Sequence, residues 1–277
     1  MLPRTVVGLM SLVAILGLTS ASAEAGPTAG ATTSLVWSDD FSGPAGAFDS
    51  ASRWTFATGG GGWGNAELQC YTKSRDNAAT NGQGQLVISA LRTPLHLCSD
   101  GHLNGYTSAR LSTQNSFSVT HGRLEIKAKL PAGAGAWPAF WALGSNEWTV
   151  GWPNCGEIDV MEYTGNRPTV TTSAVHLAAY DGSHWYSTHT STTSTTLSSQ
   201  FHVYAVNWTS DSLTFYRDKT LLSTITRAQV MQHGVWPFDK PFYLLINLAV
   251  GGIYAGPVPS TTVFPQRYVI DYVRVYH

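Results

Sequence analysis

The sequence has few charged residues. Only 12% of its 277 residues are Asp, Glu, Lys or Arg, whereas about 25% is usual for a soluble domain. Sixteen basic and 17 acidic residues leave a formal net charge of −1. A nucleic-acid-binding protein would need a basic face, and a disordered acidic segment would contain fewer hydrophobic residues than the 43% found here. We therefore expect no nucleic-acid partner and an uncharged ligand.

Long hydrophobic runs are absent, and one short run stands near the start. Met1–Arg4 is positively charged, Val6–Leu18 is apolar, and Ala21–Ala23 has the small-x-small pattern of a cleavage site. This order predicts a secretory signal peptide over residues 1–23. The apolar stretch is too short to span a bilayer comfortably, and no second segment approaches the length of a membrane helix. We expect a secreted, extracellular protein with no membrane association.

Cysteine is also scarce, with only three residues in the chain. Three cysteines allow one intramolecular disulfide at most. Cys70 and Cys98 flank a loop-rich stretch and are the preferred pair, which would leave Cys155 as a free thiol. None of the Cys and His spacings is typical of zinc sites. His184 and His189 lie in a Thr/Ser-rich stretch and are expected to be solvated rather than metal-bound.

Aromatic residues and turn formers are abundant instead. Ten Trp, twelve Tyr and ten Phe accompany 27 Gly and 13 Pro. Clusters of Gly, Pro, Asn, Asp and Ser separate short runs of strand-forming residues, which predicts many strands. Such a chain favours an all-β sandwich or jelly roll over alternating strands and helices. The clearest predicted strands are Leu86–Leu91, Gly122–Leu130, Phe201–Thr209, Ser212–Arg217, Phe242–Val250 and Tyr268–Tyr276.

The rest of the chain is expected to form one domain. Residues 24–34 are rich in Gly, Ala and Thr and are predicted to be a flexible leader, followed by a single domain over residues 35–277. Thr226–His233 is the one segment with a helical signal, and it is short. Ser187–Ser199 is too close to further strand patterns to be an interdomain linker, so we predict a long surface loop there.

Three carboxylates lie within six residues, in a segment whose other members are strand formers. Glu157 and Asp159 share a face of a regular strand, whereas Glu162 would point the other way. One extra residue, a β-bulge at Val160 or Met161, would return Glu162 to the same face. Three carboxylates on one face repel one another unless their pKa values are driven apart.

This arrangement suits glycoside hydrolysis. That reaction needs one ionised carboxylate at the anomeric carbon and one protonated carboxyl group beside the leaving oxygen. A solvated strand edge is the alternative, but Ile158, Val160, Met161 and Tyr163 are too apolar for it. The three carboxylates are therefore predicted to be catalytic.

Aromatic and polar residues near this segment suit a sugar polymer. Trp137 and Trp141 would share one face of a strand, with Phe140 on the other, and some of the nearby indoles must belong to the core. The apolar faces of sugar rings stack on indoles, which favours an uncharged polysaccharide as the ligand. Asn65 and Glu67 lie in a glycine-rich segment and could bond sugar hydroxyls.

Taken together, the motifs resemble glycoside hydrolase family 16, and most closely its endo-β-1,3-glucanase (laminarinase) branch. The similarity extends over nearly all of the predicted domain. Its carriers, in order, are Trp37–Phe41, Trp63–Asn65, Tyr106–Arg110, Gly122–Glu125, Trp137–Gly144, Glu157–Tyr163, Asn247–Gly252 and Ile270–Tyr276.

The resemblance implies a β-jelly-roll sandwich of two curved antiparallel sheets with a concave substrate cleft. It implies retention of anomeric configuration, with Glu157 as nucleophile, Glu162 as general acid/base and Asp159 tuning their protonation. In retaining enzymes the two carboxyl groups are about 5–5.5 Å apart. The five-residue spacing of the glutamates goes with the bulged strand of laminarinases. No cofactor is expected for catalysis, and we expect a monomer.

The resemblance also implies roles for several single residues. The resemblance implies that the sugar-binding subsites include Asn65, Arg110, Trp137, Trp141 and His176. A structural ion pair is the alternative for Arg110, and a hydrogen-bonded core residue is the alternative for His176. Asp271 matches a calcium ligand of several relatives, on the side away from the cleft, so a structural calcium ion is expected there.

The chain departs from the family pattern at three places. Leu177–Tyr180 stands where many laminarinases have a Gly-Pro-Gly-Tyr turn, the following segment His184–Tyr186 is unusual, and Cys155 is unexpected beside Glu157. The linkage therefore stays open. β-1,3-Glucan is the expected substrate, with mixed-linkage β-glucan or a galactan as alternatives. A transglycosylase and a non-catalytic, lectin-like sandwich are further alternatives.

Overall fold

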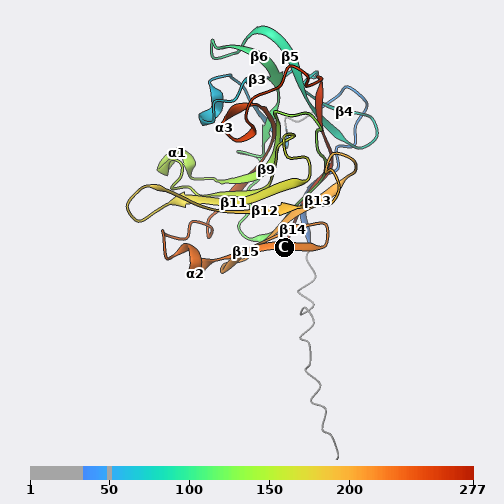
Figure 1. The fold of residues 1–277 in the computed structure, drawn as a ribbon. Coiled ribbons are helices and arrows are strands. Elements are labelled where there is room, and N and C mark those ends of the chain that lie inside the picture. Colours follow the sequence, from blue (N-terminus) through green and yellow to red (C-terminus); the bar gives the residue numbers. More distant parts are fainter. Residues whose placement is uncertain (1–33, 49–51) are drawn as a thin grey trace, which may run out of the picture. The chain divides into compact units, whose positions relative to one another are not determined.

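The computed structural model describes residues 34–48 and 52–277. The predicted signal peptide and all but the last residue of the predicted leader lie outside the described residues. None of the helices among the described residues is long and apolar enough to cross a membrane. Figure 1 shows the chain coloured from its start to its end.

The larger sheet has ten strands in the order β15-β14-β13-β8-β17-β5-β6-β3, with β1 paired to β17 and β4 paired to β5. Its pairs are antiparallel except β3 with β6. Its strands are β1 Leu35–Asp39, β3 Gln69–Tyr71, β4 Ala78–Thr80, β5 Leu86–Leu97, β6 Leu103–Ser108, β8 Gly122–Lys129, β13 His202–Trp208, β14 Ser212–Arg217, β15 Thr220–Thr226 and β17 Gln266–Tyr276.

The second sheet has seven antiparallel strands in the order β12-β11-β10-β9-β16-β7-β2. These are β2 Thr55–Ala57, β7 Arg110–Ser112, β9 Ala136–Gly144, β10 Glu157–Tyr163, β11 Val170–Ala178, β12 His184–Thr192 and β16 Phe242–Val250. The helical segments are single turns, namely the 3₁₀ turn η1 Gly62–Gly64 and the α-helices α1 Glu147–Val150, α2 Arg227–Val230 and α3 Gly252–Ala255.

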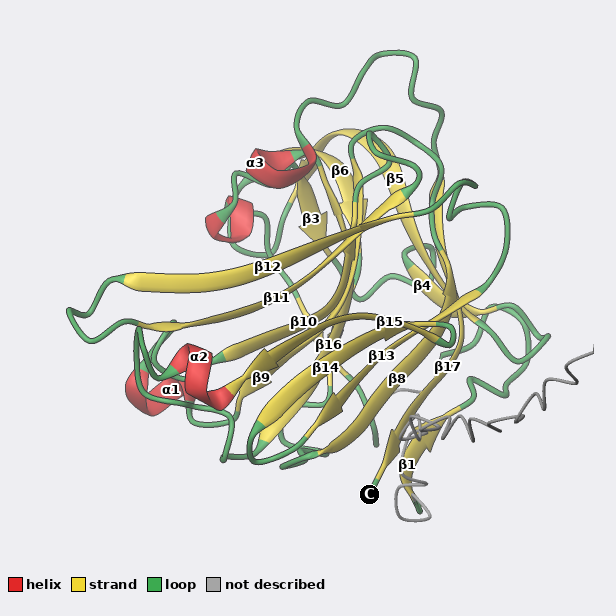
Figure 2. Cartoon of the chain, turned by 60° about the horizontal axis from the view of Figure 1, so that its bottom comes forward, coloured by secondary structure: helices red, strands yellow, loops and turns green. Residues whose placement is uncertain are grey.

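The two sheets are layered on each other, with the main core between them (Figure 2). Phe140 and Ile158 from the seven-stranded sheet and Leu124, Phe215 and Val273 from the ten-stranded sheet are fully buried in this core. The predicted all-β sandwich is therefore confirmed. All six strands that we predicted are present, and α2 lies within the segment that carried the helical signal.

The prediction of a long loop over Ser187–Ser199 is wrong for its first half. Residues 187–192 belong to β12, which pairs with β11 along its whole length at the edge of the sheet. Its side chains alternate between exposed and half-buried. Because both faces of this edge strand are partly wet, its Ser and Thr residues show no apolar alternation and resemble a loop in sequence. His184 and His189, expected in that loop, lie on β12.

Cys70 and Cys98 form a disulfide, as preferred from the sequence, and their Cα atoms are 5.5 Å apart. Cys155 is a fully buried free thiol. It packs with Leu143 and Tyr243, next to Trp141.

Candidate active site

Strand β10, which carries the three carboxylates predicted to be catalytic, contains a β-bulge. Against β9, Asp159 pairs with Trp141 and Met161 pairs with Phe140, so the ladder skips Val160. Against β11, Asp159 pairs with Ala174 and Glu162 with Thr172, again with one residue too many on β10. The predicted bulge is confirmed, and Val160 is its extra residue.

The bulge divides the side chains of β10 between two faces. Ile158, Val160, Met161 and Tyr163 are buried and belong to the main core. Asp159 is only 4% exposed, whereas Glu157 and Glu162 are partly exposed. The core residues thus occupy one face of the strand, and the three carboxylates lie on the other.

Each glutamate accepts a hydrogen bond from an indole. Trp152 Nε1 donates to Glu157 Oε2 at 2.7 Å, and Trp137 Nε1 donates to Glu162 Oε1 at 3.1 Å. Trp137 also packs against Tyr254, with ring centroids 4.9 Å apart. The indoles therefore orient the two carboxyl groups in addition to offering apolar surface.

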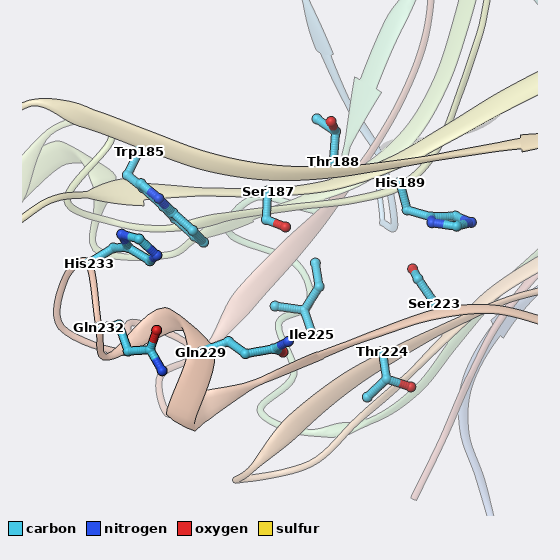
Figure 3. A pocket seen from close by; sticks show the side chains of 10 residues that line it. All are labelled: Trp185, Ser187, Thr188, His189, Ser223, Thr224, Ile225, Gln229, Gln232 and His233. Carbon is cyan, nitrogen blue, oxygen red and sulfur yellow. The ribbon is translucent and has the colours of Figure 1, made fainter.

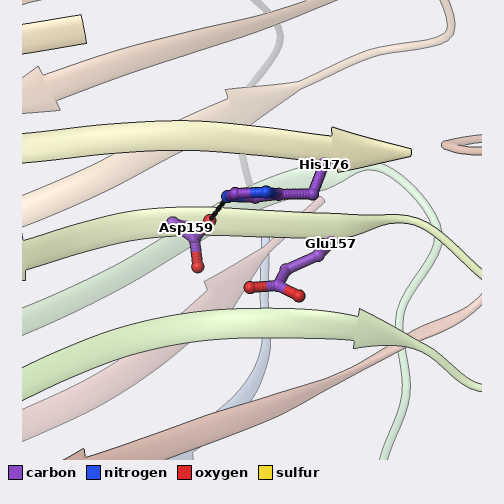
Figure 4. A group of neighbouring side chains, drawn as sticks. All are labelled: Glu157, Asp159 and His176. Atoms are coloured by element: carbon purple, nitrogen blue, oxygen red, sulfur yellow. Dashed lines mark ion pairs between the residues drawn. The ribbon is translucent and has the colours of Figure 1, made fainter. Parts of the chain in front are cut away.

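His176 lies on β11, opposite Glu157 in the ladder. Its Nε2 is 3.0 Å from Asp159 Oδ2, as Figure 4 shows, and its Nδ1 is 2.8 Å from His184 Nε2. The side chain is 19% exposed and lies beside the carboxylates. The prediction that placed His176 in a sugar subsite is not tested by this contact, which is to Asp159.

Burial raises the pKa of all three carboxyl groups. For Glu157, burial and then the charge of Asp159 raise the pKa to about 8, and for Asp159 burial raises the pKa to about 7. For Glu162, burial and the charges of Asp159 and Glu157 raise the pKa well above its ordinary value. Glu162 faces two negative neighbours, so it holds its proton most strongly. The three groups cannot all be ionised at neutral pH.

A polar and aromatic network adjoins Trp141. Its Nε1 donates to Asn247 Oδ1 at 2.8 Å, and its ring lies 4.7 Å from the guanidinium of Arg110. The guanidinium also lies 4.9 Å from the ring of Trp63, so Arg110 stacks between two indoles. Arg110 forms no salt bridge among the described residues, although its charge lowers the pKa of Glu67, so these contacts do not decide between a sugar-binding and a structural role. Asn65 reaches the same network through Glu67, at 3.3 Å.

Glu67 is a buried carboxylate. Its burial and its hydrogen-bond partners were not predicted from the sequence. Besides Asn65, it accepts hydrogen bonds from Gln69 at 2.6 Å and from the Tyr71 hydroxyl at 3.2 Å, and Tyr71 accepts one from Asn247. Glu67 accepts three hydrogen bonds from these neighbours, which hold its carboxylate in place beside the Trp141 network. The alternation of Glu67, Gln69 and Tyr71 was a signal of a shared face.

The family model described as "Glycosyl hydrolases family 16" matches residues 65–274. The chain belongs to this family. It is a glycoside hydrolase with the family's jelly-roll fold, as the motifs predicted.

Other family 16 proteins resemble the chain over most of its length. A β-glucanase from Rhodothermus marinus is 41% identical over 254 residues, which cover 87% of this chain and 84% of the relative. A glucan endo-1,3-β-glucosidase from Cryptopygus antarcticus is 38% identical and covers 81% of this chain, with 83% of its own length matched. The crystal structure of an endo-β-1,3-glucanase from Pyrococcus furiosus has a TM-score of 0.79 and 38% identity, covering 88% of this chain and 94% of that one.

Family 16 enzymes need no cofactor for catalysis. A calcium ion had been expected at Asp271, but this carboxylate is engaged by Lys127, whose Nζ lies 2.8 Å from Asp271 Oδ2. In the described part of the chain, Asp271 belongs to no group of three or more acidic, His or Cys side chains close enough to share an ion. This ion pair does not test the prediction of a structural calcium ion at Asp271, because backbone carbonyl oxygens also bind calcium.

A cavity of about 350 Å³ lies between β12 and the β15–α2 region (Figure 3). Trp185, Ser187 and His189 line it from β12, on the face of that strand opposite to His184. The three carboxylates of β10 are not among its lining residues. The candidate active site is therefore the carboxylate face of β10 and not this cavity.

Proposed function

We propose that the protein is a secreted, retaining endo-β-1,3-glucanase that hydrolyses laminarin-type glucan by double displacement. The observation that carries this proposal is the position of Glu157 and Glu162 on one face of the bulged strand, each with its own indole donor. Asp159 lies between them and is nearly fully buried.

In the first step, Glu157 attacks the anomeric carbon while Glu162 protonates the leaving oxygen. One oxygen of Glu157 and one of Asp159 lie within 4.8 Å of each other, and the charge of Asp159 raises the pKa of Glu157. When Asp159 holds the proton of this pair, Glu157 is ionised and can attack. The Trp152 N–H favours this ionised form of Glu157. The products of the step are a glycosyl-enzyme, the released chain end and an ionised Glu162.

In the second step, Glu162 removes a proton from water, and the oxygen of that water displaces Glu157 from the sugar. Glu162 regains its proton and Glu157 regains its charge, so the enzyme returns to its starting state. Two inversions at one carbon give net retention. An acceptor sugar in place of water would give transglycosylation by the same route.

Azide distinguishes the roles of the two glutamates. We expect Glu157→Ala to lose nearly all turnover of laminarin while still binding it, and azide to restore cleavage with formation of an α-glycosyl azide. In Glu162→Ala, azide should yield a β-glycosyl azide, because it replaces water in the second step. NMR of the anomeric protons distinguishes the α-glycosyl azide from the β-glycosyl azide. The reverse pattern, or full activity in Glu157→Ala, would refute the assignment.

The linkage is tested by product analysis on laminarin, lichenan and a galactan. We expect laminarin to be cut internally and fastest, because the relatives described above are named as β-1,3-glucanases or β-glucanases. Faster cleavage of lichenan or of the galactan would support those alternatives instead. Binding of laminarin without release of reducing ends would favour a non-catalytic, lectin-like protein.

Secretion and oligomeric state belong to the same proposal. Residues 1–23 would be removed on export, so the extracellular protein should begin at Glu24. N-terminal sequencing of the exported protein checks this, and retention of Met1 would contradict it. Light scattering should give the mass of one chain.

A further inference from the structure

Val160 is the extra residue of the bulge, where the pairing of β10 with β11 is irregular and the bulged residue is left outside the regular ladder. A buried carbonyl without a partner is unfavourable. The Ser173 hydroxyl supplies the partner, since its Oγ donates to the Val160 oxygen at 2.9 Å. Ser173 is itself only 3% exposed.

Ser173 lies opposite the bulge, where β10 has one residue more than β11. On β11 it lies between Thr172, which pairs with Glu162, and Ala174, which pairs with Asp159. Two residues of β10, Val160 and Met161, therefore oppose this one serine. Its side chain points toward the core side of the sheet, because neighbouring residues of a strand alternate and His176 lies on the carboxylate side.

The competing arrangement of β10 is a regular strand. Without the extra residue, every side chain beyond Asp159 would change face, and Glu162 would turn from the carboxylate face toward the core. In a regular ladder the Val160 carbonyl would pair with a backbone N–H, so the hydroxyl of Ser173 would be needed less there than in the bulged form. Ser173 therefore favours the form of the strand in which Glu162 is usable.

We propose that Ser173 is a positioning residue for the general acid, and that it acts through the backbone of the bulge at Val160. It has no hydrogen bond to any of the three carboxylates among the described residues. The proposal rests on the function assigned to Glu162 above. If Ser173 positions the acid, its removal should weaken acid catalysis by Glu162 without an equal loss of nucleophilic attack by Glu157.

Two substrates separate these effects. Laminari-oligosaccharides have a poor leaving group that needs the proton of Glu162, whereas a 2,4-dinitrophenyl β-laminaribioside has a leaving group that departs unprotonated. The value of kcat/KM reports the steps up to bond cleavage in both cases. For Ser173→Ala we expect kcat/KM to fall about tenfold or more on the oligosaccharide and less than about threefold on the aryl glycoside, since acid catalysis contributes roughly 10²–10⁴-fold.

Conservative variants and controls make the result specific. Ser173→Thr keeps the hydroxyl and should retain near-normal kcat/KM on both substrates. Ser116→Ala removes a serine hydroxyl that also donates to a backbone carbonyl, that of Thr113 at 2.9 Å, away from the bulge. It should leave the ratio of the two kcat/KM values unchanged. If Ser173→Ala does not fold, Ser173→Cys provides the same comparison with a weaker donor.

Equal losses on both substrates in Ser173→Ala would overturn the proposal, because they would indicate a general structural role. No loss on either substrate would overturn it too. Glu162→Ala is the reference for the assigned function and should show the same leaving-group pattern in stronger form. If Glu162→Ala lacks that pattern, the acid assignment fails independently of Ser173.

Discussion

Glu157 and Glu162 are ordinary glutamates whose protonation is changed by where β10 places them. Both lie beside Asp159 in a site that burial shields from water. The same burial that would suit the proposed acid Glu162 to donate a proton at neutral pH makes its ionisation unfavourable for the fold. Function and stability are therefore opposed at this residue.

This opposition predicts how stability depends on pH. Because the folded-state pKa values are raised, these carboxyls contribute stability that is fully present below about pH 4.5 and is lost as the pH rises through the folded-state values, about 8 for Glu157. Glu162→Gln removes one such group. It should melt a few degrees above the wild type at pH 8 and close to it at pH 4.5. Thermal unfolding at the two pH values checks this, with Asp76→Asn at an exposed position as the control.

Cys155 is predicted to be chemically inert in the folded protein. It is fully buried, and burial followed by the charges of Glu147 and Glu157 raises the pKa of its thiol to about 11. A thiol reagent at pH 8 should label the native protein very slowly and the guanidinium-unfolded protein at one thiol per chain. Rapid labelling of native protein would contradict this placement.

At the scale of single elements, the sequence pattern predicted the bulge in β10 correctly but predicted part of β12 as a loop. The bulge in β10 could be predicted because three carboxylates and four apolar residues had to be sorted onto two faces, and only an extra residue does so. In β12 the Ser and Thr residues had no apolar neighbours to reveal a face. An edge strand with two partly wet faces has the composition of a loop.

The disulfide between Cys70 and Cys98 connects β3 to the turn after β5 and closes a loop with a sequence separation of 28. In the chain-entropy model, a loop of this size stabilises the fold by about 3–4 kcal/mol. The double variant Cys70→Ser/Cys98→Ser should therefore melt roughly 10 °C lower than the wild type. Calorimetry measures the difference. An unchanged melting temperature would mean that the bridge is not formed in solution.

At the scale of the whole molecule, the main hydrophobic core lies between the two sheets, and Asp271 on β17 is where a structural calcium ion is predicted. Asp271 is paired with Lys127, and both side chains are partly exposed. With Lys127 as the sole partner of Asp271 among the described residues, EDTA should leave the melting temperature and the laminarin activity unchanged. Asp271→Asn should alter stability by less than about 1 kcal/mol, as is usual for an exposed ion pair. A drop of several degrees with EDTA that calcium reverses would refute this.

The sequence alone determined the strand-rich fold class, the carboxylate run Glu157–Glu162 as the candidate active site, and the need for a bulge within it. These follow from local alternation and from the chemistry of neighbouring residues, which a sequence records directly. Only the tertiary structure decided that Arg110 stacks between Trp63 and Trp141, and that Glu67 is held by buried partners. It also showed that Asp271 is taken by Lys127 and that Ser173 supports the bulge. Such contacts join strands that are neighbours only in the folded sheets, so no local pattern can report them.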